Sequence, residues 1–203
     1  MAVCEHAAVS RTTIVVLVAL GATLAGFALA SNASRLRGTE EAPDASVAAG
    51  PQKADLGWRE TYGSPGERVV FTVDSLEVTK TGWRARIGVE NSSSVAWELD
   101  PGATSDGTFG LQLFTTGNPD ELEERNRERS LPAVRAATRY MPELPPILEP
   151  KTAWEGEMSA NGALVADSWV RIVFGTLIAV GKPPEGLDEL VVWITDRAYH
   201  LRP

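Results

Sequence analysis

The sequence predicts an all-β domain, an antiparallel β-sandwich of about seven or eight strands, within residues 65–203. Several short segments of this region alternate apolar and polar residues, which is the pattern of a strand with one face buried. Glycine, proline, asparagine and serine separate these segments at short intervals, as expected for turns between neighbouring strands. No long amphipathic helix alternates with the strands, so a parallel sheet built from βαβ units is not predicted.

The clearest strand is "WRARIGVEN", residues 83–91. Its alternate residues Trp83, Ala85, Ile87 and Val89 share one face, while charged residues stand on the other. Residues 69–78 form the preceding strand, whose apolar phase shifts near Asp74 and Ser75, a sign of a β-bulge. A turn at Thr81 and Gly82 joins the two strands into a hairpin.

Further strands are predicted along the rest of the chain. The apolar segment 168–178 is the longest of them, and the chain closes with segments that contain "LVVWITD" and "AYHLR". The other predicted strands lie in "VAWEL" (95–99), "TFGLQLF" (108–114) and "TAWEGEM" (152–158). In the segment 108–114, Phe109, Leu111 and Leu113 are expected on one face.

A long insertion, residues 115–147, interrupts this series of strands. Asn118 is suited to cap a short helix with Pro119 at its first position, and Leu122 is the sole sizeable apolar residue of that helix. Long ordered connections often carry binding sites, and proline-stiffened segments lose little entropy on docking. We therefore expect partner-binding residues here, although the same apolar residues could instead cover an open sheet edge. The candidates are Leu131, Tyr140, Met141, Leu144 and Ile147.

The N-terminal part of the chain predicts export. Residues 1–11 form a short cytoplasmic leader, and residues 12–31 form an uncharged segment long enough to span a bilayer as a helix. The alternative is a signal peptide cleaved after Ala30, because Ala28 and Ala30 are small. In the first case the protein is a single-pass membrane protein with an extracytoplasmic C-terminal domain, and in the second it is secreted.

Residues 32–64 are expected to be a disordered linker, because they contain few large apolar residues and many small, charged or turn-forming ones. Trp58 and Tyr62 are the exceptions, and a contact with the domain is expected there.

Four motifs together resemble the immunoglobulin-like domains of bacterial membrane-tethered or exported proteins, many of which have no assigned function. They are "PGERVVFTVDSLEVTKTGWRARIGVEN", "FGLQLF", "LEPKTAWEGEM" and "WVRIVFG". In such domains a strand ending in asparagine marks one corner, and a Leu-Pro turn before an aromatic residue marks a later one. The resemblance implies that Leu148 and Trp154 anchor the later corner from the core while Pro150 stiffens it. It implies no catalytic residues, and the long insertion departs from it.

Composition argues against several classes of function. The net charge of −8 disfavours binding to nucleic acid. One cysteine, Cys4, precedes the apolar segment, and with two histidines in the chain no catalytic triad or histidine metal cluster is expected. The segment "GTLIAVGK" has the wrong spacing for a phosphate-binding loop. We therefore predict no cofactor, no metal and no enzymatic activity.

Three weaker signals have simpler interpretations. Glu155 and Glu157 share one strand face and could act as paired carboxylates, but a solvated face is favoured. Asp100 and Asp106 lie among turn residues and could bind calcium, although the spacing is not that of an EF-hand. The tryptophans could form a carbohydrate platform, but those at 83, 154 and 169 have apolar neighbours and are expected in the core.

The sequence thus predicts a non-catalytic, membrane-tethered interaction or sensor module that binds a protein or envelope partner outside the cytoplasm. The alternative is an exported carbohydrate-binding protein or hydrolase whose site uses acidic and aromatic residues.

Overall fold

The computed structural model describes residues 47–100, without the side chain of Asp100, and residues 108–203. The predicted leader, the predicted membrane or signal segment and residues 32–46 of the predicted linker lie outside these ranges. Within them, no helix has both the length and the apolar character needed to cross a membrane.

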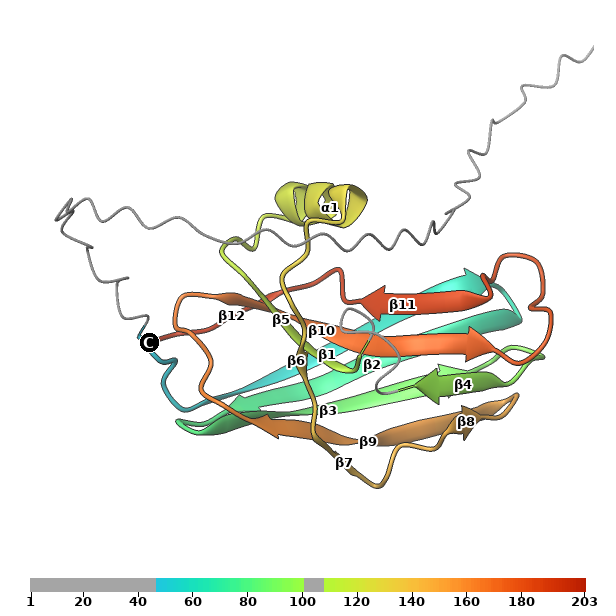
Figure 1. Ribbon diagram of the computed structural model, residues 1–203, viewed down its shortest axis with the longest axis horizontal. Helices are drawn as coiled ribbons and strands as arrows, with labels where there is room; N and C mark the ends of the chain where they lie inside the picture. Colours follow the sequence, from blue (N-terminus) through green and yellow to red (C-terminus); the bar gives the residue numbers. More distant parts are fainter. Residues whose placement is uncertain (1–46, 101–107) are drawn as a thin grey trace, which may run out of the picture. The chain divides into compact units, whose positions relative to one another are not determined.

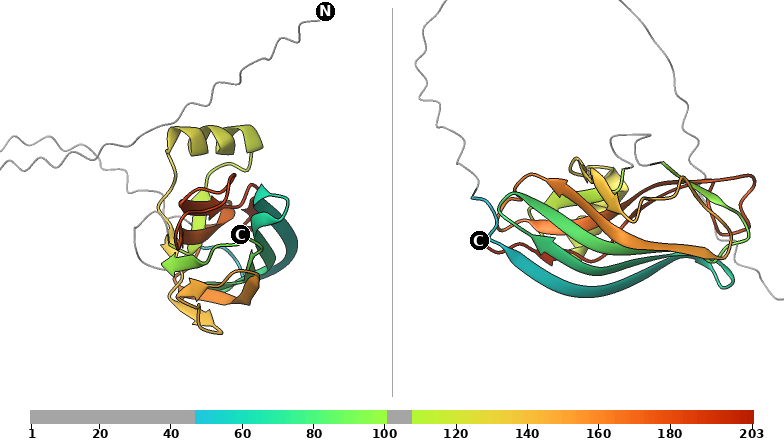
Figure 2. Two further views of the ribbon diagram at one scale, coloured as in Figure 1. Left: turned by 90° about the vertical axis from the view of Figure 1, so that its right-hand side faces the viewer. Right: turned by 90° about the horizontal axis from the view of Figure 1, so that it is seen from below.

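Two antiparallel sheets pack face to face around one apolar core, so the prediction of an all-β sandwich is confirmed (Figures 1 and 2). The first sheet has the order β1–β2–β3–β9–β7, and the second has the order β6–β5–β10–β4–β8, with β11 and β12 also paired to β10. The strands of the first sheet are β1 (Gln52–Ser64), β2 (Glu67–Val78), β3 (Gly82–Asn91), β9 (Thr152–Asn161) and β7 (Arg139–Met141). Those of the second are β6 (Arg135–Ala136), β5 (Gly110–Phe114), β10 (Trp169–Ala179), β4 (Trp97–Asp100), β8 (Ile147–Leu148), β11 (Leu190–Ile194) and β12 (Tyr199–His200).

The strands outnumber the seven or eight predicted, for two reasons. Three of them, β6, β7 and β8, contain two or three residues each, too short to show a period in the sequence. The fourth additional strand, β1, lies in the predicted linker. The eight remaining strands coincide with predicted segments.

The prediction of a linker is wrong for residues 52–64. Strand β1 pairs with β2 from Gln52 opposite Val78 to Ser64 opposite Glu67, with a register shift between Asp55 and Trp58. Trp58 is buried, but it is the sole buried residue of this edge strand. An edge strand with so little core surface lacks the strong apolar alternation from which strands are predicted. Its inward-facing polar residues are instead held by hydrogen bonds to β11 and the C-terminus.

The central hairpin of the first sheet is as predicted. The register of β2 against β3 shifts between Val73 and Ser75, which confirms the bulge. Trp83, Ala85, Ile87 and Val89 are all buried, and Arg84 and Arg86 point to solvent.

Strand β10 is buried on both faces, and helix α1 (Pro119–Glu128) lies on the outer side of the second sheet (Figure 1). Asn118 caps the helix by accepting a hydrogen bond from the backbone N–H of Asp120, as predicted. Leu122 is buried, and the side-chain oxygen of Asn126 accepts a hydrogen bond from the guanidinium of Arg171 at 2.9 Å. The insertion therefore begins with a helix that is part of the packed domain.

Asn91 joins the two predicted corners. Its side-chain nitrogen faces the carbonyl oxygens of Val95, Leu148 and Glu149 at 2.8, 3.1 and 3.0 Å, and its side-chain oxygen accepts from the backbone N–H of Ser93 at 3.0 Å. The residue is completely buried. One amide thus connects the end of β3, the turn that follows it and the end of β8.

Trp83→Ala should destabilise the domain by about 3–5 kcal/mol, because it removes a large side chain from between the sheets. Arg84→Ala is the control, since this neighbouring residue points outward and pairs with Glu77 at the surface. Its effect on the free energy of unfolding should be much smaller. Equal losses for the two variants in urea denaturation would show that the strand face is assigned wrongly.

Asn91→Ala should cost at least about 2 kcal/mol, because buried carbonyl groups of two other segments lose their donor. Asn91→Asp should be worse near neutral pH, where a carboxylate would face those carbonyl oxygens, and should partly recover in acid when the carboxyl can donate. Asn161 ends β9 as Asn91 ends β3 but is exposed, so Asn161→Ala should change the stability by less than about 0.5 kcal/mol. Similar thermal and urea midpoints for the two alanine variants would contradict a structural role for Asn91.

Candidate functional site

A groove of about 760 Å³ lies between the segment that follows α1 and strand β11. Its volume is in the range of sites that bind small molecules or single side chains of a partner. Leu131 and Pro132 line one side, Leu190 and Val192 line the other, and polar residues complete the lining. We call this recess the α1–β11 groove.

Strand β11 supplies an apolar wall because both of its faces carry apolar side chains. Val191 is buried and Trp193 packs against the core, whereas Leu190 and Val192 on the opposite face are 57% and 37% exposed. The outward positions of β3, in contrast, carry Arg84 and Arg86. A strand that is apolar on both faces normally has both faces covered. The outer face of β11 is covered only in part.

A buried arginine fixes the position of α1 relative to β11. Arg171 on β10 donates hydrogen bonds to the carbonyl oxygens of Thr195 and Ile194, the latter at 3.3 Å, and to Asn126 on α1. Its guanidinium also lies 5.5 Å from the centre of the Phe114 ring. Burial lowers the pKa of Arg171, an effect that nearby carboxylates oppose. These contacts link the helix, β5, β10 and the end of β11 through one side chain.

Gln112 holds the other wall of the groove. It lies directly opposite Arg171 in the pairing of β5 with β10, and its side-chain nitrogen donates to the carbonyl oxygen of Pro132 at 2.8 Å. The segment that carries Leu131 and Pro132 is therefore attached to the sheet. Both walls of the groove are held by buried or part-buried hydrogen bonds, which indicates a pre-formed recess.

The inner face of β11 is fastened to the first sheet by Glu60 of β1. The carboxylate accepts hydrogen bonds from the indole N–H of Trp193 at 2.7 Å and from the backbone N–H of Asp196 at 3.0 Å. The Trp193 ring is stacked on Phe71 with a centroid distance of 5.2 Å. Burial raises the pKa of Glu60, and the hydrogen bond from Trp193 offsets part of that rise.

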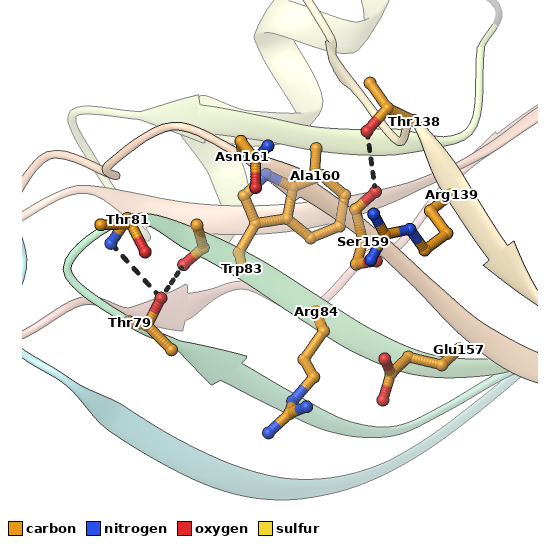
Figure 3. Close-up of a pocket in the computed structure, with 11 residues that line it drawn as sticks. Thr79, Thr81, Trp83, Arg84, Thr138, Arg139, Glu157, Ser159, Ala160 and Asn161 are labelled. Atoms are coloured by element: carbon orange, nitrogen blue, oxygen red, sulfur yellow. Dashed lines mark hydrogen bonds between the residues drawn. The ribbon is translucent and has the colours of Figure 1, made fainter.

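A second, smaller recess of about 270 Å³ lies at the outer side of β3, β9 and β7 (Figure 3). Figure 3 shows Arg139 near Ser159, while Arg84 extends away from them, and Arg84 pairs with Glu77 at 2.7 Å. The ring of Trp83 lies behind this recess and is only 4% exposed. The recess is therefore polar, without an accessible aromatic surface from Trp83.

The structure separates the five partner-binding candidates into two places. Leu131 lines the α1–β11 groove. The others lie in a stretch that passes from β6 in the second sheet to β7 in the first and back to β8, across the side of the sandwich opposite β1. Their exposure differs: Tyr140 and Leu144 pack against the core, whereas Met141 is 69% and Ile147 43% exposed.

Tyr140 illustrates the covering role of this stretch. Its ring lies edge-on to Phe109 and Trp154, with centroid distances of 6.1 and 6.4 Å, and burial raises the pKa of its hydroxyl to about 12. The indole N–H of Trp154 donates to the carbonyl oxygen of Glu143 at 3.1 Å. Tyr140 and Leu144 thus cover this side of the sandwich, in line with the alternative given for the insertion, whereas Met141 and Ile147 do not.

Leu190 and Val192 are binding candidates that the sequence reasoning did not single out. The signal in the sequence is that all residues of β11 are apolar, so neither face of this strand can be polar. An apolar run predicts a strand but does not show which of its faces remains open.

The weaker candidates gain little support. Glu155 is exposed and Glu157 partly exposed on a strand facing solvent, and Trp83 and Trp154 are buried as expected, with Trp169 partly so. Asp106 and the side chain of Asp100 lie outside the described residues. Within residues 47–100 and 108–203, no cluster of three or more metal-ligating side chains occurs.

Comparison with known proteins gives no relative. No family model matches the chain, and neither the curated proteins nor the solved structures include a significant match. The function is therefore inferred from the site itself.

Glu60→Gln should remove a pH dependence from the stability of the domain. The folded state binds the Glu60 proton more tightly than the unfolded chain does, so protonation of Glu60 stabilises the folded state in acid. This stabilisation is lost as the pH rises from about 4.5 through the raised pKa of Glu60. The stability of the native protein relative to Glu60→Gln should therefore fall over that interval. Urea denaturation of both proteins across the acid range measures the difference. A difference that is constant or grows with pH would contradict the assignment.

Proposed function

We propose that this domain is a non-catalytic interaction module that binds a protein partner outside the cytoplasm through the α1–β11 groove. The observation that carries the proposal is the exposed apolar side of β11, which faces Leu131 and Pro132 across a recess with hydrogen-bonded walls. Exposed apolar surface next to polar residues is typical of binding sites.

The rigidity of the groove supports binding by a pre-formed surface. Arg171 and Gln112 hold its two sides, and Glu60 holds the strand that forms one wall. A surface that needs no ordering on association loses less conformational entropy than a mobile loop.

We propose that residues 12–31 anchor the protein in the membrane, with the domain outside the cytoplasm. The alternative is that the chain is cleaved after Ala30 and the domain is secreted. Ala48 pairs with Val165 and the carbonyl oxygen of Val47 accepts a hydrogen bond from the backbone N–H of Ala166, so a tether can include residues 32–46 at most. Fully extended, such a segment spans no more than about 55 Å. An anchored domain would thus meet partners close to the membrane surface.

We propose in addition that the sandwich has an immunoglobulin-like topology. The two-sheet sandwich and the meeting of the corners at Asn91 support it. The alternative of a carbohydrate-binding protein or hydrolase gains no support from the recess in Figure 3, since the Trp83 ring is covered.

Site-specific photo-cross-linking in cells tests the proposed function. A photoreactive phenylalanine derivative at Val192, on the groove wall, should give one discrete protein adduct in the envelope fraction. The matched control is Arg86, whose side chain is 65% exposed on the outer face of the first sheet, and it should give none. Adducts of equal yield at both positions, or no adduct at Val192, would show that the groove is not the partner-binding site and would contradict the proposed function.

A further inference from the structure

We infer that the α1–β11 groove accepts a short peptide segment that combines an apolar side chain with neighbouring basic residues. This inference rests on the proposed function and specifies the chemistry of the partner. It follows from two separate properties of the groove, its apolar walls and the charge on its β11 side.

The apolar walls define the anchor of the peptide. Leu190 and Val192 project from β11 toward solvent, and Leu131 and Pro132 lie on the facing wall. A leucine, phenylalanine or tryptophan side chain placed between these walls would lose its contact with water on both sides.

Exposed acids flank the apolar wall. Glu189 immediately precedes Leu190, Asp196 follows the end of β11 and lines the groove, and Glu185 lies in the preceding turn. Within the described part of the chain, none of these three carboxylates forms an ion pair. They are therefore available to basic side chains on either side of an apolar anchor.

The basic groups near the groove do not cancel this acidity. On the β11 side the exposed bases are Lys182 and Arg197, and they are outnumbered by the exposed acids Glu185, Asp188, Glu189 and Asp196. Arg171 is buried and hydrogen-bonded to three groups, and Arg129 lines the facing wall. The whole chain has a net charge of −8, which also attracts a basic partner and repels an anionic lipid surface. A basic peptide is thus favoured over a phospholipid headgroup as the occupant.

Selection from a random dodecapeptide phage library on the full-length protein tests this chemistry. We expect enrichment of peptides with a large apolar residue next to lysine or arginine. A synthetic copy of an enriched peptide should bind the native protein, and Leu190→Asn should weaken that binding by at least about tenfold. Asp196→Asn should weaken it several-fold, and added salt should reduce binding to the native protein.

Met141→Asn is the matched control, because Met141 is also an exposed apolar residue but lies on β7, at the edge of the first sheet. It should leave the affinity within about twofold of the native value. Enrichment of acidic or uncharged peptides, indifference to Leu190→Asn, or no enrichment at all would overturn the inference.

The two experiments can fail separately. An adduct at Val192 in cells together with non-basic peptides from the library would reject the chemistry of the partner while the interaction module stands. Basic peptides that bind in the groove without an adduct in cells would reject the proposed function instead.

Discussion

The side chain of Asn91 is the interaction on which the rest of the sandwich depends. The two sheets are connected at one end by the turn after β3 and by the turn that leads into β9, and both turns leave buried carbonyl oxygens. A buried carbonyl without a donor is costly, and a single amide satisfies those of Val95 and Leu148. Ser93 completes the junction, since its hydroxyl bonds to Asn91 and accepts the indole N–H of Trp97. This junction places β4 and β8 of the second sheet against the first.

A second buried polar group organises the outer side of the second sheet. Arg171 occupies a strand position that would otherwise be solvated, and its hydrogen bonds reach both α1 and the end of β11. The helix is thereby tied to β10 and to the end of β11, and the α1–β11 groove lies next to these contacts. Arg171 thus helps to fix the position of the candidate binding site.

Much of the fold follows from local patterns. The hairpin of β2 and β3, its bulge, the cap of α1 and the burial of Trp83 were all predicted from period and turn chemistry, and all are confirmed. The candidate site was predicted less well. Leu131 was identified, but Tyr140 and Leu144 belong to the cover of an open edge, and the opposite wall of the groove was not recognised. A one-dimensional pattern separates apolar from polar positions, but it does not say which apolar face lacks a neighbour.

The sequence by itself determined the fold class, the helix cap and the inward faces of the long strands, because each depends on residues close together in the chain. Tertiary structure decided three other features: that residues 52–64 form a strand, that the insertion crosses between the two sheets, and that β11 keeps an open apolar side. Each of these depends on contacts between distant residues, such as Glu60 with Trp193 and Asn126 with Arg171. The free energy of those contacts exists only once the core has brought the segments together, so local composition carries no trace of it.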